Sequence, residues 1–437
     1  MLTASDPADR GTGPMPYQPK VRVTDKYKVV GFISSGTYGR VYKALGRGNK
    51  LGEFAIKKFK PDKEGEQVAY TGISQSAIRE MSLCTELSHE NVIKLIEIIL
   101  EDKCIFMVFE YAEHDLLQII HHHTQQPRHP IQPSMVRSIM FQLLNGCQYL
   151  HTNWVLHRDL KPANIMVTSQ GEVRIGDLGL ARRFEKPLQS LFSGDKVVVT
   201  IWYRAPELIL GSHHYTPAID LWAVGCIFAE LMSLRPIFKG EEAKMDSKKT
   251  VPFQRNQMQK IIDIMGMPNK DKWHFLATMP EYPQLVTMSP AGSSHHSHHH
   301  HHHHHSQHRG GSQVSASNLE KWYYSTITQQ GGTTAAHAAT SSSPLAALGA
   351  EGYKLLAGLL EYDPEKRLTA AQALQHSFFN TGDRVSSNCF EGLTNEYPHR
   401  RVSQDDNDIR TSSLPGTKRS GLPDDSLVRQ SKRVKEG

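Results

Sequence analysis

Apolar positions form two different patterns along this chain, and the change between them divides it into two regions. Between residues 27 and 111, short β-branched and aromatic runs dominate: YKVVGFIS, GRVYKAL, EFAIKKFK, VIKLIEIIL and CIFMVFEYA. Such runs are typical of strands, and together they predict an antiparallel sheet. One helical pattern interrupts them at residues 74–87, SQSAIREMSLCTEL, where apolar residues recur every three or four positions.

Helical patterns prevail from about residue 134 onward, beginning with SMVRSIMFQLLNGCQYLH. The most apolar segment, LWAVGCIFAELM at 221–232, is shorter than the roughly 18 residues that span a bilayer, and it contains Glu230. It predicts a buried core helix. We therefore expect an α+β fold with a small β-rich lobe, about residues 27–111, and a larger, mainly helical lobe, about residues 112–380.

Three polar regions lie outside these patterns. Residues 1–26 resemble a flexible N-terminus with no secretion signal. Low-complexity stretches at 289–317 and 329–344, the first containing a histidine run, predict an insertion at about 289–344. Residues 381–437 are polar and charged and predict a disordered tail. Loose metal binding by the histidine run is an alternative function, although no second group there would orient the imidazoles.

Composition narrows the class of protein only moderately. The chain has 437 residues and a formal net charge of +6, which permits acidic partners without indicating nucleic-acid binding. Its five cysteines are scattered, with no C-x-x-C pair, so we expect neither a disulfide framework nor a zinc site. No membrane association is expected.

The first candidate chemistry lies in the β-rich region. GFISSGTYGRVYKA at 31–44 predicts two strands joined by a turn in which Gly36 and Gly39 would let backbone amides approach a polyphosphate. Glycines in a hairpin are more often only turn residues. Lys57 follows on a predicted strand, where a buried ammonium needs a partner, and Glu80 on the 74–87 helix is the candidate.

The second candidate is HRDLKPANIMV at 157–167, followed by GDLGLAR. Asp159, Lys161 and Asn164 fall within six residues, and Asp177 precedes Leu178-Gly179. A lone loop Asp is usually a cap or turn residue. Two acids and an amide in this order are instead the oxygen ligands that Mg²⁺ takes together with phosphates.

With these motifs the sequence resembles the eukaryotic protein kinases over roughly residues 27–380. Ala205-Pro206-Glu207, DLWAVG with Asp220 and Trp222, and PEKRLTA with Arg367 extend the match. In the family the arginine matched by Arg367 pairs with the glutamate matched by Glu207. One position departs from the pattern, because Ser34 replaces the first glycine of G-x-G-x-x-G. We expect this to alter nucleotide affinity without abolishing catalysis.

The resemblance implies ATP and Mg²⁺ as cofactors and assigns roles. Asp159 is the catalytic acceptor of the substrate hydroxyl proton, Lys161 neutralises charge on the γ-phosphate, and Asn164 and Asp177 hold the metal. The implied nucleotide-binding residues are Ile33, Ser34, Ser35, Gly36, Thr37, Tyr38, Gly39, Arg40, Val41, Ala55, Lys57, Glu80, Phe109, Glu110, Ala112 and Asp115. Among these, Asp115 would reach the ribose.

Within the kinases, SQSAIRE and TIWYRAPE resemble cyclin-dependent kinases of the Mediator-associated branch, whose partner is cyclin C. The resemblance implies that this cyclin docks on the 74–87 helix and that other subunits of the Mediator kinase module bind as well. Asp195 stands near the position where cell-cycle relatives carry a phosphorylated threonine. We expect it to be a permanent, weaker anchor for Arg79, Arg158 and Arg182, rather than an ordinary loop acid.

Substrates and location follow from the same resemblance. Val198, Val199 and Arg204 match residues that accept proline after the target hydroxyl, so Ser/Thr-Pro sites are expected. The branch acts on the C-terminal repeat of RNA polymerase II and on transcription factors, with both positive and negative effects on transcription. Basic clusters at 418–419 and 432–435 favour the nucleus. The alternatives are a cell-cycle type kinase and a non-catalytic scaffold with the kinase fold.

Overall fold

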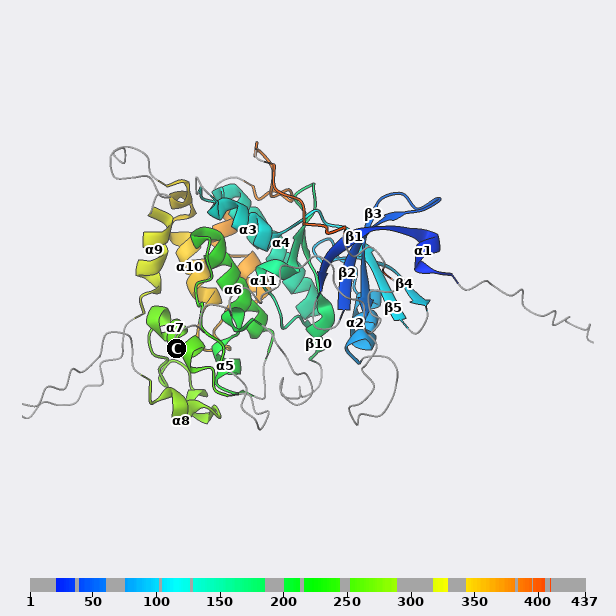
Figure 1. Ribbon diagram of the computed structural model, residues 1–437. Coiled ribbons are helices and arrows are strands. Elements are labelled where there is room, and N and C mark those ends of the chain that lie inside the picture. Colours follow the sequence, from blue (N-terminus) through cyan, green and yellow to red (C-terminus); the bar gives the residue numbers. More distant parts are fainter. Residues whose placement is uncertain are drawn as a thin grey trace, which may run out of the picture.

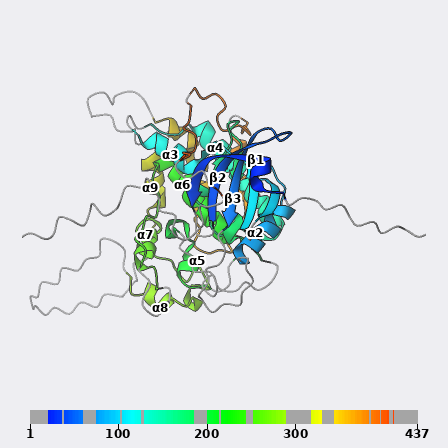
Figure 2. The ribbon, with the colours of Figure 1, turned by 45° about the vertical axis from the view of Figure 1, so that its right-hand side comes forward.

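The computed structural model describes residues 21–35, 39–59, 75–101, 104–125, 129–184, 200–212, 216–243, 252–288, 317–328, 343–381, 384–394, 396–404 and 409. A β-rich lobe and a larger helical lobe lie side by side (Figures 1 and 2). The expected bilobal α+β fold is confirmed. Across those ranges, no helix has the length and apolar character required to cross a membrane.

The small lobe is built on one five-stranded antiparallel sheet. Its strands are β1 (Tyr27–Ser35), β2 (Gly39–Gly46), β3 (Glu53–Phe59), β4 (Leu95–Glu101) and β5 (Cys104–Glu110), in the order β1-β2-β3-β5-β4. All five predicted strands and their antiparallel pairing are confirmed. The predicted helix is α2 (Gln75–Glu86), which packs beside the sheet.

Side-chain alternation in the strands sends neighbouring residues to two different clusters. Val41 and Ala55 face the main core that continues into the helical lobe, whereas Tyr42 and Ile56 belong to a cluster on the outer face of the sheet. Because successive side chains point to opposite faces, Lys57 lies on the same face as Ala55. The sheet therefore turns this lysine toward α2.

The helical lobe surrounds α4 (Pro133–Thr152) and α6 (Ala218–Ser233), and α6 is buried along nearly its whole length. The other helices are α3 (Leu116–Thr124), α5 (Pro206–Ile209), α7 (Arg255–Met265), α8 (Tyr282–Leu285), α9 (Leu319–Thr328), α10 (Gly349–Leu359), α11 (Ala370–Leu374) and α12 (Ser377–Asn380). Short strands lie where the lobes meet: β6 (His114–Asp115), β7 (Val155–Leu156), β8 (Ile165–Val167), β9 (Val173–Ile175) and β10 (Arg182–Arg183).

The predicted boundary at residue 26 is wrong for the residues just before it. α1 (Val23–Lys26) lies inside the expected flexible segment. Val23 is fully buried in the outer cluster, and its backbone N–H donates to Glu101 Oε2 at 2.8 Å. One apolar side chain and one buried hydrogen bond fix this turn, which is too short to show a period in the sequence.

The insertion predicted at about 289–344 also contains an ordered element. Helix α9 buries Leu319, Tyr323 and Ile327, which repeat at four-residue spacing, against the helical lobe. The two low-complexity stretches therefore flank a core helix. The histidine run lies outside the described residues.

The prediction of a disordered tail from residue 381 is wrong for residues 384–394 and 396–404. Cys389 and Tyr397 are buried, and Ile409 is buried in the outer cluster of the small lobe. These apolar residues are far apart in a polar sequence, and each packs separately against one of the two lobes. No periodic pattern in the sequence therefore revealed them. In Figure 1 this orange segment passes from the helical lobe toward β1.

Candidate active site

Three charged side chains meet where α2 faces the junction of the lobes. Lys57 Nζ donates to both carboxylate oxygens of Glu80 at 2.8 Å and to Asp177 Oδ1 at 2.9 Å. The predicted Lys57–Glu80 pair is thus confirmed. Glu80 is 1% exposed, while the Asp177 carboxylate is 48% exposed. The ammonium is held from behind by a buried acid, and Asp177 remains open to the cleft.

The charges of this trio support one another. Burial alone would lower the pKa of Lys57, but the carboxylates of Asp177 and Glu80 outweigh it, and the pKa is raised. The Lys57 ammonium in turn lowers the pKa of Asp177 to about 2. Lysine is therefore cationic and Asp177 ionised at neutral pH, as phosphate and metal binding require.

Asp177 is positioned by the backbone around it. The Gly176 N–H donates to Asn164 O at 2.8 Å, and the Gly176 carbonyl contacts His157 Nε2 at 2.8 Å. Asp177 itself has φ 53°, a left-handed conformation that is uncommon for a residue with a side chain. These bonds bring the loop after β9 against the loop before β8 and place Asp177 beside Asn164.

The second group of side chains lies in the loop between β7 and β8. Lys161 Nζ donates to Asp159 Oδ2 at 2.8 Å, and Asn164 Nδ2 donates to Asp159 O at 2.8 Å and to Asp159 Oδ2 at 3.0 Å. Asp159 is 8% exposed. Burial raises its pKa, with Lys161 acting in the opposite direction. Both of these side-chain contacts use Oδ2. A buried carboxylate whose other oxygen, Oδ1, can accept a proton fits a general base.

The same loop is fixed from below by Asp220 at the start of α6. Asp220 Oδ2 accepts from the His157 N–H and Oδ1 accepts from the Arg158 N–H, both at 2.9 Å. Arg158 has φ 68°. The Asp220 carboxylate thus binds two successive backbone N–H groups, those of His157 and of the left-handed Arg158. This fixes the direction of the backbone as it reaches Asp159.

The oxygens needed for Mg²⁺ are present in this arrangement. Asn164 uses Nδ2 for Asp159, so its Oδ1 makes no hydrogen bond to the part of the chain that is described, and neither does Asp177 Oδ2. Mg²⁺ is typically held by one or two protein oxygens together with substrate phosphates and water. Asn164 and Asp177 therefore fit the ion that the sequence implied.

The remaining predicted nucleotide residues that the structure describes lie on β1, β2, β3 and β5 and on the segment that leads from β5 to α3. Ile33, Ser34 and Ser35 end β1, and Gly39, Arg40 and Val41 begin β2. Ala55 pairs with Phe109 across β3 and β5, and both are buried. The chain continues through Glu110 and the buried Ala112 to Asp115, the N-cap of α3. Gly36, Thr37 and Tyr38 lie outside the described residues.

The structure describes all three arginines of the predicted cluster but not Asp195. Arg158 Nε donates to Leu180 O at 2.7 Å, and Arg182 pairs with Leu156 between β10 and β7. Arg79 lies on α2, which packs on the turn at Leu178–Leu180. Asp195, Val198 and Val199 fall outside the described residues, so the anchor role of Asp195 remains a prediction.

One side chain near the site was not found from the sequence. Arg400, from the region predicted to be disordered, places its Nε 3.6 Å from Asp115 Oδ2. Its own surroundings carry no motif, and only three-dimensional proximity identifies it. The predicted pair of Glu207 and Arg367, in contrast, is confirmed as a bidentate contact at 2.8 and 3.0 Å.

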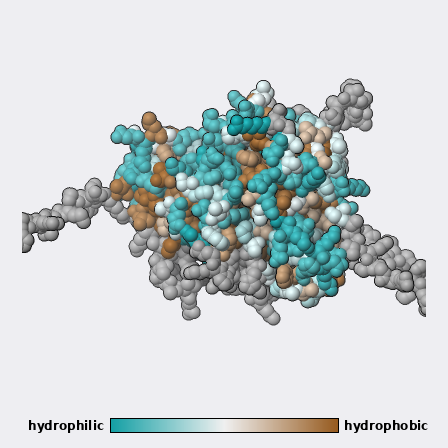
Figure 3. All heavy atoms as spheres, turned by 180° about the vertical axis from the view of Figure 1, so that it is seen from behind, coloured by the Kyte–Doolittle hydropathy of each residue, from teal (hydrophilic) through white to brown (hydrophobic). Residues whose placement is uncertain are grey.

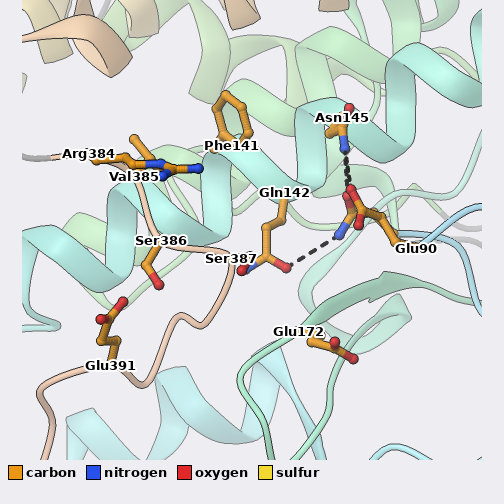
Figure 4. A pocket seen from close by; sticks show the side chains of 11 residues that line it. Glu90, Phe141, Gln142, Asn145, Glu172, Arg384, Val385, Ser386, Ser387 and Glu391 are labelled. Carbon is orange, nitrogen blue, oxygen red and sulfur yellow. Dashed lines mark hydrogen bonds between the residues drawn. The ribbon is translucent and has the colours of Figure 1, made fainter.

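A polar cavity of about 530 Å³ lies elsewhere, between α4, the loop before β4 and residues 384–391 (Figure 4). Asn145 Nδ2 donates there to Glu90 Oε1 at 3.2 Å, and Asn91 Nδ2 donates to Gln142 Oε1 at 3.3 Å. None of the lysine, asparagine or aspartates of the cleft lines it. It is therefore separate from the candidate active site.

Comparison with known proteins gives consistent results. The family model described as protein kinase domain matches residues 27–379. The serine/threonine-protein kinase SSN3 of Gibberella moniliformis is 78% identical over 99% of this chain and 95% of its own length. That of Aspergillus oryzae is 68% identical over 98% of this chain and 97% of its own.

A solved structure, the crystal structure of the yeast RNA Pol II CTD kinase CTDK-1 complex, is 28% identical with a TM-score of 0.62 and covers 85% of this chain and 99% of that chain. Family match, relatives and fold agree with the Lys57, Asp159, Asn164 and Asp177 constellation. The chain belongs to the protein kinase family and is a serine/threonine-protein kinase.

Proposed function

We propose that this protein is a cyclin-dependent kinase of the Mediator kinase module that transfers the γ-phosphate of ATP to Ser/Thr-Pro sites. The observation that carries the catalytic part is the Lys57 ammonium held between Glu80 and Asp177. A kinase fold that had lost activity has no need to keep a buried lysine paired in this way, and this favours an enzyme over a scaffold.

The residues of the cleft divide the work among themselves. Lys57, oriented by Glu80, binds the α- and β-phosphates, and Asn164 and Asp177 hold Mg²⁺. ATP and Mg²⁺ supply the phosphoryl group and neutralise its charge. Asp159 accepts the proton of the substrate hydroxyl, while Lys161, which donates to Asp159 Oδ2, provides a positive charge beside the transferred group.

Exposed apolar residues on the small lobe support a protein partner. Ile78 on α2 is 47% exposed, and on β4 Leu100 is 62% and Ile96 39% exposed. The view from behind shows apolar surface on this lobe (Figure 3). The structural neighbour was solved as a complex. We assign this surface around α2 to a cyclin of the cyclin C type, with further Mediator kinase-module subunits binding elsewhere.

The substrate proposal rests on likeness and on the sequence. The yeast neighbour is named as an RNA Pol II CTD kinase, and the residues matched to a proline-accepting pocket include Arg204. We propose the C-terminal repeat of RNA polymerase II and transcription factors as substrates, with activating and repressing outcomes. The nucleus is the corresponding location, and the basic clusters at 418–419 and 432–435 would direct import.

The test is phosphate transfer by the full chain bound to cyclin C, using repeat peptides with Ser-Pro and with Ser-Ala. We expect transfer to the Ser-Pro peptide, much weaker transfer to Ser-Ala, and a loss of about 10²–10⁴-fold in kcat for Asp159→Asn with ADP binding retained. Equal rates for wild type and Asp159→Asn would refute the proposal that this site catalyses phosphate transfer. Equal rates for the two peptides would refute proline direction alone.

A further inference from the structure

The polar cavity beside α4 lies apart from the catalytic cleft and takes no part in the phosphate transfer proposed above. Its volume of about 530 Å³ is in the size range of pockets that enclose a ligand. Its walls come from α4, from the turns that precede β4 and β9, and from residues 384–391 (Figure 4). Segments far apart in the chain therefore meet around a space large enough for several side chains of a partner.

Three amide side chains form the inner wall of this cavity, and hydrogen bonds fix each of them. Asn91 Nδ2 donates to Gln142 Oε1 at 3.3 Å and to the Val173 carbonyl at 2.9 Å. Gln142 Nε2 donates to a hydroxyl at 3.1 Å and to a backbone carbonyl at 3.2 Å. Asn145 Nδ2 donates to Asn91 Oδ1 at 2.9 Å and to Glu90 Oε1 at 3.2 Å. All amide N–H groups of the wall are thus used, and the wall is preformed.

The polar atoms of the wall that stay available are acceptors. Asn145 Oδ1 and Glu90 Oε2 make no hydrogen bond within the described ranges of the chain. A ligand that meets this wall must therefore supply N–H groups. A guanidinium carries five N–H donors and no acceptor, so an arginine side chain matches the wall in hydrogen bonding.

The charge around the cavity favours the same kind of ligand. Glu90, Glu172 and Glu391 are exposed, and Arg384 is the only cation among the described lining residues. Glu172 also pairs with Arg174 at 2.7 Å, which leaves Glu90 and Glu391 as the stronger sources of negative potential. In the same described ranges, no three His, Cys, Asp or Glu side chains converge as a metal ion would require. The cavity therefore suits an extended cationic segment and repels nucleic acid.

A transient partner fits this cavity better than a permanent subunit. Permanent interfaces bury large and mostly apolar surfaces. Among the described lining residues only Phe141 and Val385 are apolar, and both are half-buried. Acidic surface instead accelerates the encounter with a basic segment more than it prolongs the complex. A substrate has these requirements, because it must leave after each transfer, and a site outside the cleft can be occupied together with the cleft.

We propose that this cavity is a docking site for basic segments of protein substrates, with an arginine side chain donating to Asn145 Oδ1 and Glu90 Oε2. The proposal rests on the proposed function and deepens it. Among the proposed substrates it selects transcription factors, since proteins that bind nucleic acid carry basic segments. A docked segment raises the local concentration of a connected Ser/Thr-Pro site, so KM for such a substrate falls while kcat stays the same.

The first test measures binding of a labelled probe peptide, Gly-Arg-Arg-Val-Leu-Gly, to the full chain bound to cyclin C, by fluorescence anisotropy. Glu90→Gln/Glu391→Gln removes two carboxylates of the cavity and should weaken binding about tenfold. The matched control, Glu320→Gln/Glu365→Gln, removes two exposed carboxylates outside the cavity and should bind as wild type does. The proposal is overturned if the two double variants bind the probe alike, or if a probe with glutamine in place of both arginines binds wild type equally well.

The second test determines whether the docked segment belongs to a substrate. Ser-Pro peptides are extended by Arg-Arg-Val-Leu through Gly/Ser linkers of about 10, 20 and 30 residues, which span roughly 17–30 Å on average. With at least one linker, KM should be about five- to tenfold lower than for the version with glutamines, at equal kcat. The difference should vanish in Glu90→Gln/Glu391→Gln. Equal KM values with all three linkers would overturn the assignment to substrates.

A third variant examines the chain's own basic cluster at 432–435 as a competing occupant. Lys432→Gln/Arg433→Gln/Lys435→Gln should bind the probe as wild type does. Tighter binding would show that the tail occupies the cavity, and would overturn the assignment to substrates. Because the probe is bound without turnover, these outcomes are distinct from failure of wild type to transfer phosphate to a Ser-Pro peptide, which would refute the proposed function.

Discussion

Asp220 shows at the scale of a single residue how a side chain outside the reacting group determines its geometry. Its two oxygens accept the N–H groups of His157 and Arg158, and Oδ2 also contacts His151 Nε2 at 2.9 Å. Asp220→Asn replaces one acceptor by a donor that faces N–H groups. We expect the free energy of unfolding to fall by about 1–3 kcal/mol, with a lower kcat, measured by denaturant titration and by the transfer assay.

The pH dependence of that difference identifies the carboxylate as its cause. Burial opposes ionisation of Asp220, but the contacts with His151 and His157 outweigh it and lower its pKa. A group whose pKa is lowered by folding stabilises the fold above its unfolded pKa of about 3.9 and loses this contribution as the pH falls below that value. The gap between wild type and Asp220→Asn should therefore be full at pH 7 and narrow below about pH 4. A gap that does not change with pH would contradict this cause.

Residue pairs differed in how far the sequence could predict them. Two pairs were predictable, Lys57 with Glu80 and Glu207 with Arg367, because all four residues belong to sequence motifs of the kinase family. Arg400 with Asp115 was not, since the contact depends on where an irregular segment crosses the lobe junction. The motifs contain the candidate catalytic residues of the cleft. Contacts around them, such as that of Arg400 with Asp115, depend on packing and leave no motif in the sequence.

At the scale of elements, α2 is the helix through which a partner would act on the site. Its inner face carries Glu80, and its outer face exposes Ile78. Ile78→Asp should weaken binding of the cyclin by about tenfold or more, because an apolar contact becomes a desolvated charge. The control is Leu51→Asp at a 90% exposed residue of the loop between β2 and β3. Similar affinities for both variants, measured by calorimetry, would place the docking surface elsewhere.

Long elements with a clear apolar pattern were predictable, and short elements were not. The five strands of the sheet and α2 were found because each spans seven or more residues that form a β-branched and aromatic run or a helical repeat. Strands of two or three residues, such as β6 and β10, are too short to show alternation. β6 pairs with β8, and β10 pairs with β7, the strand that leads into the loop held by Asp220. Residues 396–404 were not predictable either, because their few apolar residues are scattered through polar sequence.

At the scale of the whole molecule, the buried pair of Glu207 and Arg367 joins segments 160 residues apart in the chain. Glu207 lies in the first turn of α5, after the segment that leads away from Asp177, and Arg367 precedes α11 at the base of the helical lobe. The Arg367 side chain is 0% exposed and that of Glu207 is 3% exposed. Arg367 also donates to the carbonyls of Ala218 and Glu361, so the pair connects α5, α6 and the turn before α11.

Removing one member of this pair should therefore cost more than removing both. Glu207→Gln leaves a buried guanidinium with a neutral partner, and we expect the free energy of unfolding to fall by about 3–5 kcal/mol. The double variant Glu207→Gln/Arg367→Met should lose less than the sum of its single changes, because no uncompensated charge remains. Denaturant titrations of the four proteins give the coupling directly, with Lys354→Gln at an exposed ion pair as a control that should leave stability unchanged. Additive losses would show that the two side chains stabilise the molecule separately. In that case the contact would not connect α5, where the segment leading from Asp177 ends, to the base of the helical lobe.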